Sequence, residues 1–462
     1  MDCNSISTNH RRPTPHWLWP LLSFIATRVY LLGFFHAALT SDVNFYFDYA
    51  VNTVDIGYAP YTAEMHVEYP PLAYWVIAAP RWFDSRRVDQ QVLERGELPE
   101  FFRDYTRAIH VEMFVCDLVA FLLFLGIVLL RRPELLVLSA WGYVLSTTLL
   151  AHVLYDRLDA ALLMLVLAWA YCWLRVDRSR WPVPWQVLSY LWLGLGISFK
   201  LIPILIVPFA VVADARAIRN LRALPGFILG LVVLLLAAAG PFAMHYQSSQ
   251  GGVLGLFRLH SDRMIEVESL WGTAVWLLRT IWPAAAKHDT GSWNIVSAIS
   301  PALMEASKYC LLAWLALLGA LACWPWRAFD RTSAYRTALL ALLGALVLTK
   351  VLSVQFFVWG LPLALLLAAE RLPQPQFALV LGMALAIAAL STWVFPYLFF
   401  TEYQFNGRTI VNSHALIPRL DWLPCTLLAV RNGLLAGLVV WLAKANLGRP
   451  PAGREPKPAA TI

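Results

Sequence analysis

The sequence predicts an all-α polytopic membrane protein: a bundle of about twelve transmembrane helices, with amphipathic helices in the loops of one face. Of its 462 residues, 59% are hydrophobic and 14% are charged, whereas soluble domains carry about 25% charged residues. Apolar runs of about 20 residues, long enough for a helix to cross a bilayer, recur along the whole chain. The six cysteines are scattered and show neither metal-ligand spacing nor a disulfide framework.

The first apolar run, residues 16–39, is too long for the core of a cleaved signal peptide and has no small-residue cleavage site, which predicts an uncleaved anchor. Eleven more spans are expected at residues 109–130, 135–154, 160–174, 185–199, 201–212, 223–244, 309–324, 338–348, 356–368, 377–400 and 423–443. Some are joined almost without a loop, as between Phe199 and Pro203. Helices broken in this way are tolerated where they line a cavity inside the protein.

Residues 1–446 are expected to form one transmembrane domain with two large loops on one side, about 40–107 and 245–308. Within these loops, residues 73–83 and 269–282 are expected to lie along the membrane interface. Residues 447–462 are rich in proline, alanine and basic residues, which is typical of a disordered tail.

Alternating spans divide the chain between two sides of the membrane. Short loops dense in arginine fall on one side, for example around Arg131, Arg178 and Arg331, and the positive-inside rule makes that side cytoplasmic, together with both termini. The long loops then face away from the cytoplasm. The net charge of +7 follows from these basic loops and needs no nucleic-acid partner. The sequence has no glycine-rich phosphate loop of the P-loop or Rossmann type. Because the outer face has no pool of nucleotide sugars or ATP, chemistry there needs a lipid-borne or extracellular substrate.

Two acidic residues of the first long loop are candidates for the site. Asp42 follows the first span directly, where a carboxylate could take a proton from a substrate hydroxyl as general base. It could equally be an ordinary surface aspartate. Glu68 precedes Pro70 and Pro71, whose fixed φ angles stiffen the loop, so Glu68 is either a substrate contact or part of a structural turn.

Several cations fall at the outer boundary: Arg157, Lys200, Arg258, Arg263 and Lys350. A single lysine at a helix end commonly extends to the lipid headgroups, but the whole set would suit a phosphate at headgroup depth. His260 and Arg263 belong to a loop that could cap a cavity, although His260 could also be a plain loop residue.

Inside the first two spans, Arg28 and Asp117 lie at comparable depth. A charge at that depth is costly unless it is paired or wetted, which favours a structural ion pair.

Five segments with a shared character run in order over most of the chain: Asp42 with Gly57, Pro60-Tyr61 and Glu68-Tyr69-Pro70-Pro71-Leu72; Tyr155-Asp156-Arg157-Leu158-Asp159-Ala160; Phe199-Lys200-Leu201-Ile202-Pro203; His260-Ser261-Asp262-Arg263 with Glu268-Ser269-Leu270; and Lys350 with Gln355 and Trp359. Together these segments resemble glycosyltransferase family 87, part of the GT-C superfamily of polyprenyl-phosphate-sugar-dependent transferases. Val354 stands where similar sequences have proline.

The resemblance implies a GT-C helical bundle in a bacterial plasma membrane with its active site on the outer face. The donor would be a polyprenyl-phosphate sugar, with mannose the best-known case, and the acceptor a glycolipid, a glycan or a protein. Asp42 would be the general base of an inverting transfer. Lys200, Arg263 and Lys350, with Arg157 and His260, would stabilise the leaving phosphate, while Glu68 and Gln355 would contact hydroxyl groups. No cofactor and no metal ion is expected.

Two other classes stay open. A transporter or flippase would also show twelve spans, broken helices and buried charges, but the halves of this chain show no convincing internal repeat. A non-catalytic scaffold would leave the gathering of Asp42, Lys200, Arg263 and Lys350 on one side unexplained.

Overall fold

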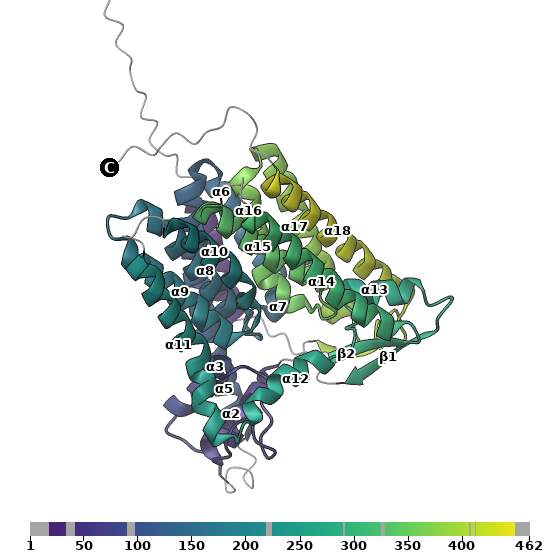
Figure 1. Cartoon of the computed structure of the whole chain (residues 1–462). Helices are drawn as coiled ribbons and strands as arrows, with labels where there is room; N and C mark the ends of the chain where they lie inside the picture. The colour runs from purple at the N-terminus through teal and green to yellow at the C-terminus, as the bar shows by residue number, and fades with distance from the viewer. Residues whose placement is uncertain are drawn as a thin grey trace, which may run out of the picture.

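Helices make up most of the structure, a computed structural model that describes residues 18–33, 42–89, 98–218, 224–289, 292–324, 329–405, 408–411 and 413–448. Twelve helices of these segments pack as a bundle (Figure 1), and each coincides with one predicted span. They are α1 (Leu18–Gly33), α5 (Leu98–Arg131), α6 (Leu136–Leu149), α8 (Asp159–Arg175), α9 (Pro182–Phe199), α10 (Val207–Ala217), α11 (Leu224–Ser248), α14 (Ser300–Cys323), α15 (Arg331–Leu348), α16 (Phe357–Arg371), α17 (Gln374–Thr392) and α18 (Trp422–Leu447). Each predicted span therefore has a helical counterpart in the part of the chain that is described, and the number of helices that cross the membrane stays a prediction.

The bundle has inner helices that are mostly buried and outer helices that are mostly exposed, and both kinds are apolar. By length and composition, seven of the described helices can cross a membrane. In the most apolar windows of α8 and α16, 83% and 78% of residues are buried, compared with 17% in α11 and α14. Helices that are apolar all round yet barely buried belong in lipid. The chain is therefore an integral membrane protein with a protein-lined core.

The outer helix α11 packs tightly on α9. A Cβ atom added to Gly194 would lie 2.7 Å from the Cβ of Ala237, and one added to Gly230 would meet the ring of Tyr190. Small residues at such contacts let helix backbones approach closely in a membrane.

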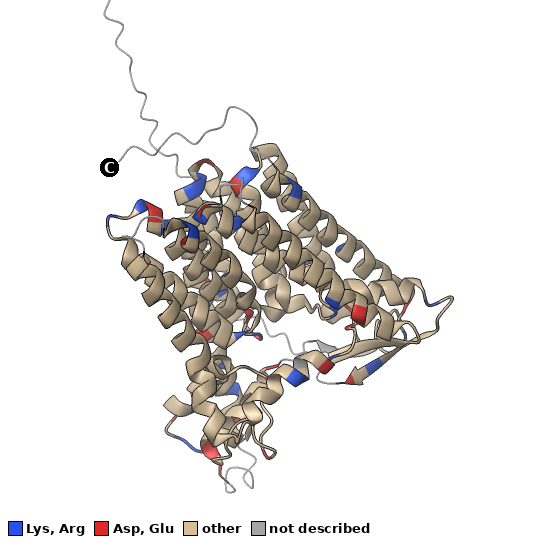
Figure 2. Ribbon diagram, in the orientation of Figure 1, with Lys and Arg blue, Asp and Glu red and all other residues tan. Residues whose placement is uncertain are grey.

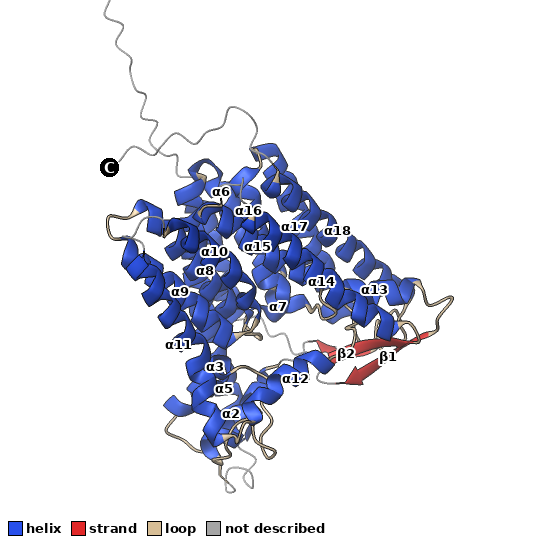
Figure 3. Cartoon of the chain, in the orientation of Figure 1, coloured by secondary structure: helices blue, strands red, loops and turns tan. Residues whose placement is uncertain are grey.

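The shorter elements collect at one end of the bundle, here called the loop face (Figures 1 and 3). They comprise α2 (Val43–Ala50), α3 (Pro71–Phe83), α7 (Ala151–Leu154), α12 (Gly255–Asp262), α13 (Leu270–Leu277) and two antiparallel hairpins, β1 (Ala284–Asp289) with β2 (Ser292–Ser297) and β3 (Glu402–Phe405) with β4 (Arg408–Val411). The helices α3 and α13 match the two predicted interfacial segments. The hairpins are additional to the all-α prediction and lie outside the bundle.

The opposite end, here called the arginine face, carries Arg131, Arg178, Arg216, Arg331 and Arg371, and the ribbon in Figure 2 has the colour of lysine and arginine at several positions there. Two of them form ion pairs: Arg131 with Glu370 at 2.7 Å, and Arg331 with Asp214 at 2.7 Å. The predicted gathering of arginines on one side is confirmed for these residues. The predicted tail beyond residue 448, and the basic residues 11, 12, 219, 222 and 327, lie outside the described residues.

The predicted pair of Arg28 and Asp117 joins three helices in the core. The Nε atom of Arg28 lies 2.8 Å from Asp117 Oδ2, and both side chains are buried. The Arg28 guanidinium also donates to Thr148 of α6 at 2.8 Å, while the hydroxyls of Tyr143 and Tyr155 donate to Asp117 at 2.8 and 3.0 Å. A buried ion pair whose remaining polar atoms are also satisfied is the form that a low-dielectric core tolerates.

Candidate active site

A cavity of about 440 Å³ lies where the bundle meets the loop face. Five residues that the sequence singled out line it: Glu68, Lys200, Arg263, Lys350 and Gln355. They come from the first long loop, the end of α9, the segment after α12 and the junction between α15 and α16. The volume is within the range typical of small-molecule sites, about 300–1,000 Å³. Residues far apart in sequence therefore share one site, as predicted.

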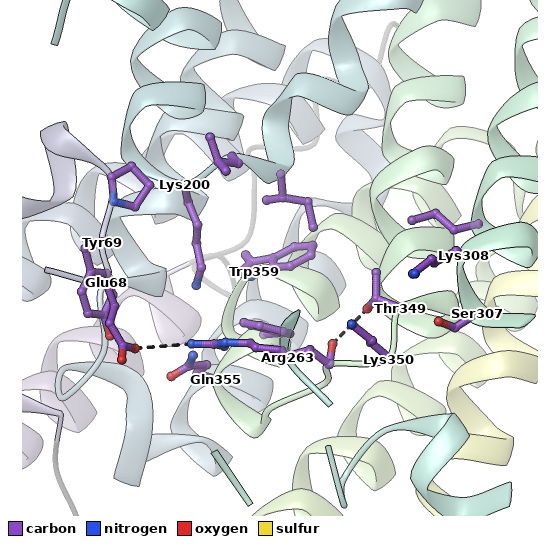
Figure 4. Close-up of a pocket in the computed structure, with 16 residues that line it drawn as sticks. Glu68, Tyr69, Lys200, Arg263, Ser307, Lys308, Thr349, Lys350, Gln355 and Trp359 are labelled. Atoms are coloured by element: carbon purple, nitrogen blue, oxygen red, sulfur yellow. Dashed lines mark hydrogen bonds and ion pairs between the residues drawn. The ribbon is translucent and has the colours of Figure 1, made fainter. Parts of the chain in front are cut away.

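The rest of the wall is largely apolar, and Leu201, Ile202, Leu311 and Phe356 contribute to it. Figure 4 shows Glu68 and Tyr69 at one end, Ser307 and Lys308 at the other, and Arg263 between them. A cavity that combines cations with apolar walls suits an amphipathic anion.

Lys200 reaches the wall because α9 ends directly before it. Its backbone is extended, and Pro203, which has no N–H to continue an α-helical ladder, begins a 3₁₀ turn at Ile202–Ile206. The Lys200 Nζ lies 2.8 Å from Asp159 Oδ1 and 4.9 Å from the centre of the Phe356 ring. The predicted break in the helix is confirmed, and its lysine already has a carboxylate partner.

Arg263 lies across the cavity from Glu68 (Figure 4), and the Arg263 Nη2 and Glu68 Oε2 atoms are 3.5 Å apart. Glu68 is held by the following prolines, since Pro71 is the first residue of α3. The Nε atom of Arg263 is buried without a hydrogen-bond partner among the described residues. The Nε–H group of this guanidinium can therefore donate a hydrogen bond to a further anionic or hydroxyl partner.

Lys350 differs from the other cations in its partners. Its Nζ donates to the backbone carbonyl of Ser261 at 2.8 Å, and no carboxylate of the described chain lies within ion-pair distance of it. Burial, together with the nearby charge of Lys308, lowers the pKa of Lys350 below its usual range. An anion bound beside Lys350 would relieve both effects.

Gln355 and Trp359 bring polar atoms to the same wall, one helical turn apart. The 3₁₀ turn Val354–Phe356 leads into α16 and points both side chains into the cavity. Gln355 Oε1 and Trp359 Nε1 are buried and have no hydrogen-bond partner among the described residues. The whole Trp359 side chain is also buried, with 2% of it exposed. Buried polar groups are nearly always paired, so a ligand with hydroxyl groups fits this wall.

Asp42 and Arg157 lie beside the cavity but are not among the residues that line it. Asp42, at the N-terminus of α2, forms an ion pair with Arg157. Tyr69 is one of the wall residues, and its hydroxyl lies 3.2 Å from Asp42 Oδ2. Arg157, expected beside a substrate phosphate, thus neutralises Asp42 in this structure, and its contact with substrate stays a prediction.

Two other expectations stay untested. His260 belongs to α12, but its side chain lies outside the described part of the structure. Within the described residues, no three His, Cys, Asp or Glu side chains gather as metal ligands would, and the absence of a metal requirement stays a prediction.

Sequence reasoning did not single out the other residues of the wall, among them Tyr69, Lys308 and Trp359. Lys308 directly precedes the span predicted at residues 309–324, which is the same signal that identified Lys200 and Lys350, but in the structure it lies within α14. Tyr69 and Trp359 belong to the segments that carry the family resemblance, but neither residue type by itself indicates a wall position.

Comparison with known proteins gives one structural similarity. No family model matches the chain, and no curated protein matches it. Among solved structures, it is similar to the crystal structure of ArnT from Cupriavidus metallidurans bound to undecaprenyl phosphate, with 14% identity, a TM-score of 0.41, and coverage of 94% of this chain and 78% of that one. Similarity at this level assigns no activity, and membership of glycosyltransferase family 87 stays a prediction.

Proposed function

We propose that this protein is a GT-C membrane glycosyltransferase. In the proposed reaction a sugar, most simply mannose, moves from polyprenyl phosphate to an acceptor hydroxyl at the extracytoplasmic face. The observation that carries the proposal is the convergence of Glu68, Lys200, Arg263, Lys350 and Gln355 on one partly apolar cavity. A cavity of this composition accommodates a lipid chain, a phosphate and a polyhydroxylated ring together.

The donor is proposed to lie with its phosphate beside Lys350 and Arg263. Lys350 has no carboxylate partner in the described chain, and Arg263 has a buried Nε atom to offer. Apolar residues beside them, Leu311 and Val351, provide a surface for the first prenyl units. These cations would stabilise the charge that grows on the phosphate as the anomeric bond breaks.

The sugar ring then falls against Gln355 and Trp359, whose unpaired carbonyl oxygen and indole N–H accept from and donate to its hydroxyls. The acceptor is proposed to approach from the end with Glu68 and Tyr69 (Figure 4). Its hydroxyl oxygen attacks the anomeric carbon on the face opposite the phosphate, which inverts that centre. Its proton passes to the carboxylate of Asp42.

A direct test uses the purified protein in lipid nanodiscs with polyprenyl-phosphate sugars and a panel of glycolipid, glycan and peptide acceptors. Asp42→Asn keeps the shape of the side chain and removes the base, so transfer should fall by at least about 10²-fold. Asp48→Asn, an exposed aspartate of the same helix, is the matched control and should retain wild-type transfer. If Asp42→Asn transfers sugar as well as Asp48→Asn does, Asp42 is not the base.

A transporter with the same cavity would move lipid-linked sugar across the bilayer and form no glycosidic bond. If labelled donor crosses the membrane of proteoliposomes and no acceptor is glycosylated, the transferase proposal fails.

A further inference from the structure

We propose that the hydroxyl of Tyr69 carries the acceptor proton to Asp42, so that Tyr69, and not Asp42, meets the acceptor. The inference rests on the proposed transferase function and adds a residue to it. It starts from a mismatch in the geometry. Asp42, the proposed base, is not among the residues that line the cavity, whereas Tyr69 lines the cavity and also contacts Asp42.

The hydroxyl of Tyr69 sits between two other polar groups. It donates to Asp42 Oδ2 at 3.2 Å and lies 3.3 Å from the hydroxyl of Tyr46. Tyr46 is 1% exposed, and its ring meets that of Tyr69 edge-on. Since Tyr69 gives its single proton to Asp42, it accepts from Tyr46. A phenol oxygen can accept more than one hydrogen bond, so Tyr69 keeps a position for the acceptor hydroxyl.

The backbone holds this side chain in place. The hydroxyl of Tyr61 donates to the carbonyl oxygen of Tyr69 at 2.8 Å, and Pro70 and Pro71 fix the chain that follows. A relay residue must keep its hydroxyl within hydrogen-bond distance of both partners, and a tyrosine anchored on each side of its Cα meets that requirement.

The protonation states suit a relay. Burial is the main cause that raises the pKa of Tyr69 and of Tyr46 above the usual range, and the charge of Asp159 adds to it in both. The hydrogen bond with Tyr46 lowers the pKa of Tyr69 in part. Both phenols therefore carry their protons at neutral pH. Asp42 has the Arg157 guanidinium beside it. Burial lowers the pKa of Arg157 to about 10, so this guanidinium is charged at neutral pH.

The step balances without a further reactant. The acceptor O–H bond breaks and its proton joins the Tyr69 oxygen, while the Tyr69 proton moves to the Asp42 carboxylate. The acceptor oxygen uses the freed electron pair to bond to the anomeric carbon. The bond from that carbon to the donor phosphate breaks, and its electron pair leaves with the phosphate. Tyr69 is neutral before and after, and one negative charge has moved from Asp42 to the leaving group.

The first experiment measures transfer by Tyr69→Phe in nanodiscs, with kcat and KM resolved for donor and acceptor. A relay predicts a loss of about 10²-fold in kcat with little change in donor KM, since the ring and its packing remain. The matched control is Tyr49→Phe, whose ring also faces Tyr69 but whose hydroxyl has no contact with Asp42. It should retain kcat within about threefold of wild type. Tyr69→Phe activity within the same margin, alongside an inactive Asp42→Asn, would overturn the inference.

A second measurement needs no variant and so does not depend on whether Tyr69→Phe folds. Single-turnover transfer by the wild type is followed in mixtures of H₂O and D₂O. If two protons move in one step, a plot of the rate against the deuterium fraction of the solvent curves downward. Direct transfer of one proton to Asp42 gives a straight line in the same plot and would contradict the relay. If the wild type forms no glycosidic bond at all, the proposed function fails instead, which keeps the two outcomes distinct.

Discussion

Neighbouring charges on the loop face differ in how completely they are paired. Glu266 and Lys350 are joined through their backbones, since the Glu266 N–H donates to the Lys350 carbonyl at 3.0 Å. Glu268, two residues on, has the buried Arg431 of α18 as its partner at 3.3 Å, while Glu266 Oε2 is buried and unpaired among the described residues. The unpaired groups are therefore the ones whose charge state should respond to pH or ligand.

Glu266 makes stability depend on pH. Burial, and then the charge of Glu268, raise its pKa from 4.5 to about 7. The folded protein thus holds this proton more tightly than the unfolded chain, so the stabilisation is fully present below about pH 4.5 and is lost as the pH rises through about 7. Glu266→Gln, which mimics the protonated side chain, should melt at a higher temperature than wild type at pH 8 and show a flatter dependence between pH 5 and pH 8.

Thermal unfolding in detergent, measured across that pH range, checks this prediction. Glu64→Gln, an exposed glutamate of the same face, is the control and should follow wild type. A Glu266→Gln protein whose melting temperature tracks wild type at every pH would contradict the assignment.

Lys350 should report on the donor. Because no carboxylate of the described chain neutralises it, Lys350→Ala removes a charge that only an anion would use, and we expect donor KM to rise by about tenfold or more with acceptor KM unchanged. Lys287→Ala, an exposed lysine of β1, should leave both unchanged. Equal effects on donor and acceptor would argue against a phosphate contact.

Among helices and strands, the apolar helices followed from the sequence and the polar elements did not. The helix α5 begins at Leu98, eleven residues before the predicted span, because its first turns are amphipathic and bury only Phe101 and Tyr105. The strand β1 reads Ala-Ala-Ala-Lys-His-Asp, which has little strand preference. Its partner β2 is held by tertiary contacts, including a bridge between Asn294 and Glu266. Such contacts leave no local signal.

The same distinction holds within the site. The sequence placed Lys200 and Lys350 on the same face, because each lies at a helix boundary and helix ends in a membrane protein fall at a known depth. Which charges pair depends on side-chain geometry, and so the ion pair of Asp42 with Arg157, and the position of Tyr69 between Asp42 and the cavity, could not be predicted.

The ion pair of Arg28 and Asp117 links α1 to α5. Removing one partner leaves a buried charge, so Arg28→Met should cost about 3–5 kcal/mol of stability, while the double change of Arg28→Met with Asp117→Leu should recover part of it. Reversible unfolding in mixed micelles measures both. Arg103→Met, an exposed arginine of α5, should change stability by less than about 0.5 kcal/mol. If the double variant is no more stable than Arg28→Met alone, the loss of stability in Arg28→Met is not caused by the unpaired charge of Asp117.

The whole molecule is asymmetric between its two ends. One end is covered by short arginine-bearing connections, while the other carries the interfacial helices, the hairpins and the cavity (Figures 1 and 2). The polar wall residues lie at the boundary between bundle and loop face, whereas transporter sites lie near the bilayer midplane. This arrangement is consistent with the proposed transferase, and the orientation of the loop face away from the cytoplasm stays a prediction of the positive-inside rule.

The most direct test of the account is an experimental structure of the protein with polyprenyl phosphate bound. We predict lipid density in the 440 Å³ cavity, with the phosphate oxygens within about 4 Å of the Lys350 and Arg263 nitrogens and the prenyl chain leaving along Leu311. A lipid phosphate held instead at the arginine face, or an empty cavity at saturating lipid, would contradict the claim that this cavity is where the donor reacts.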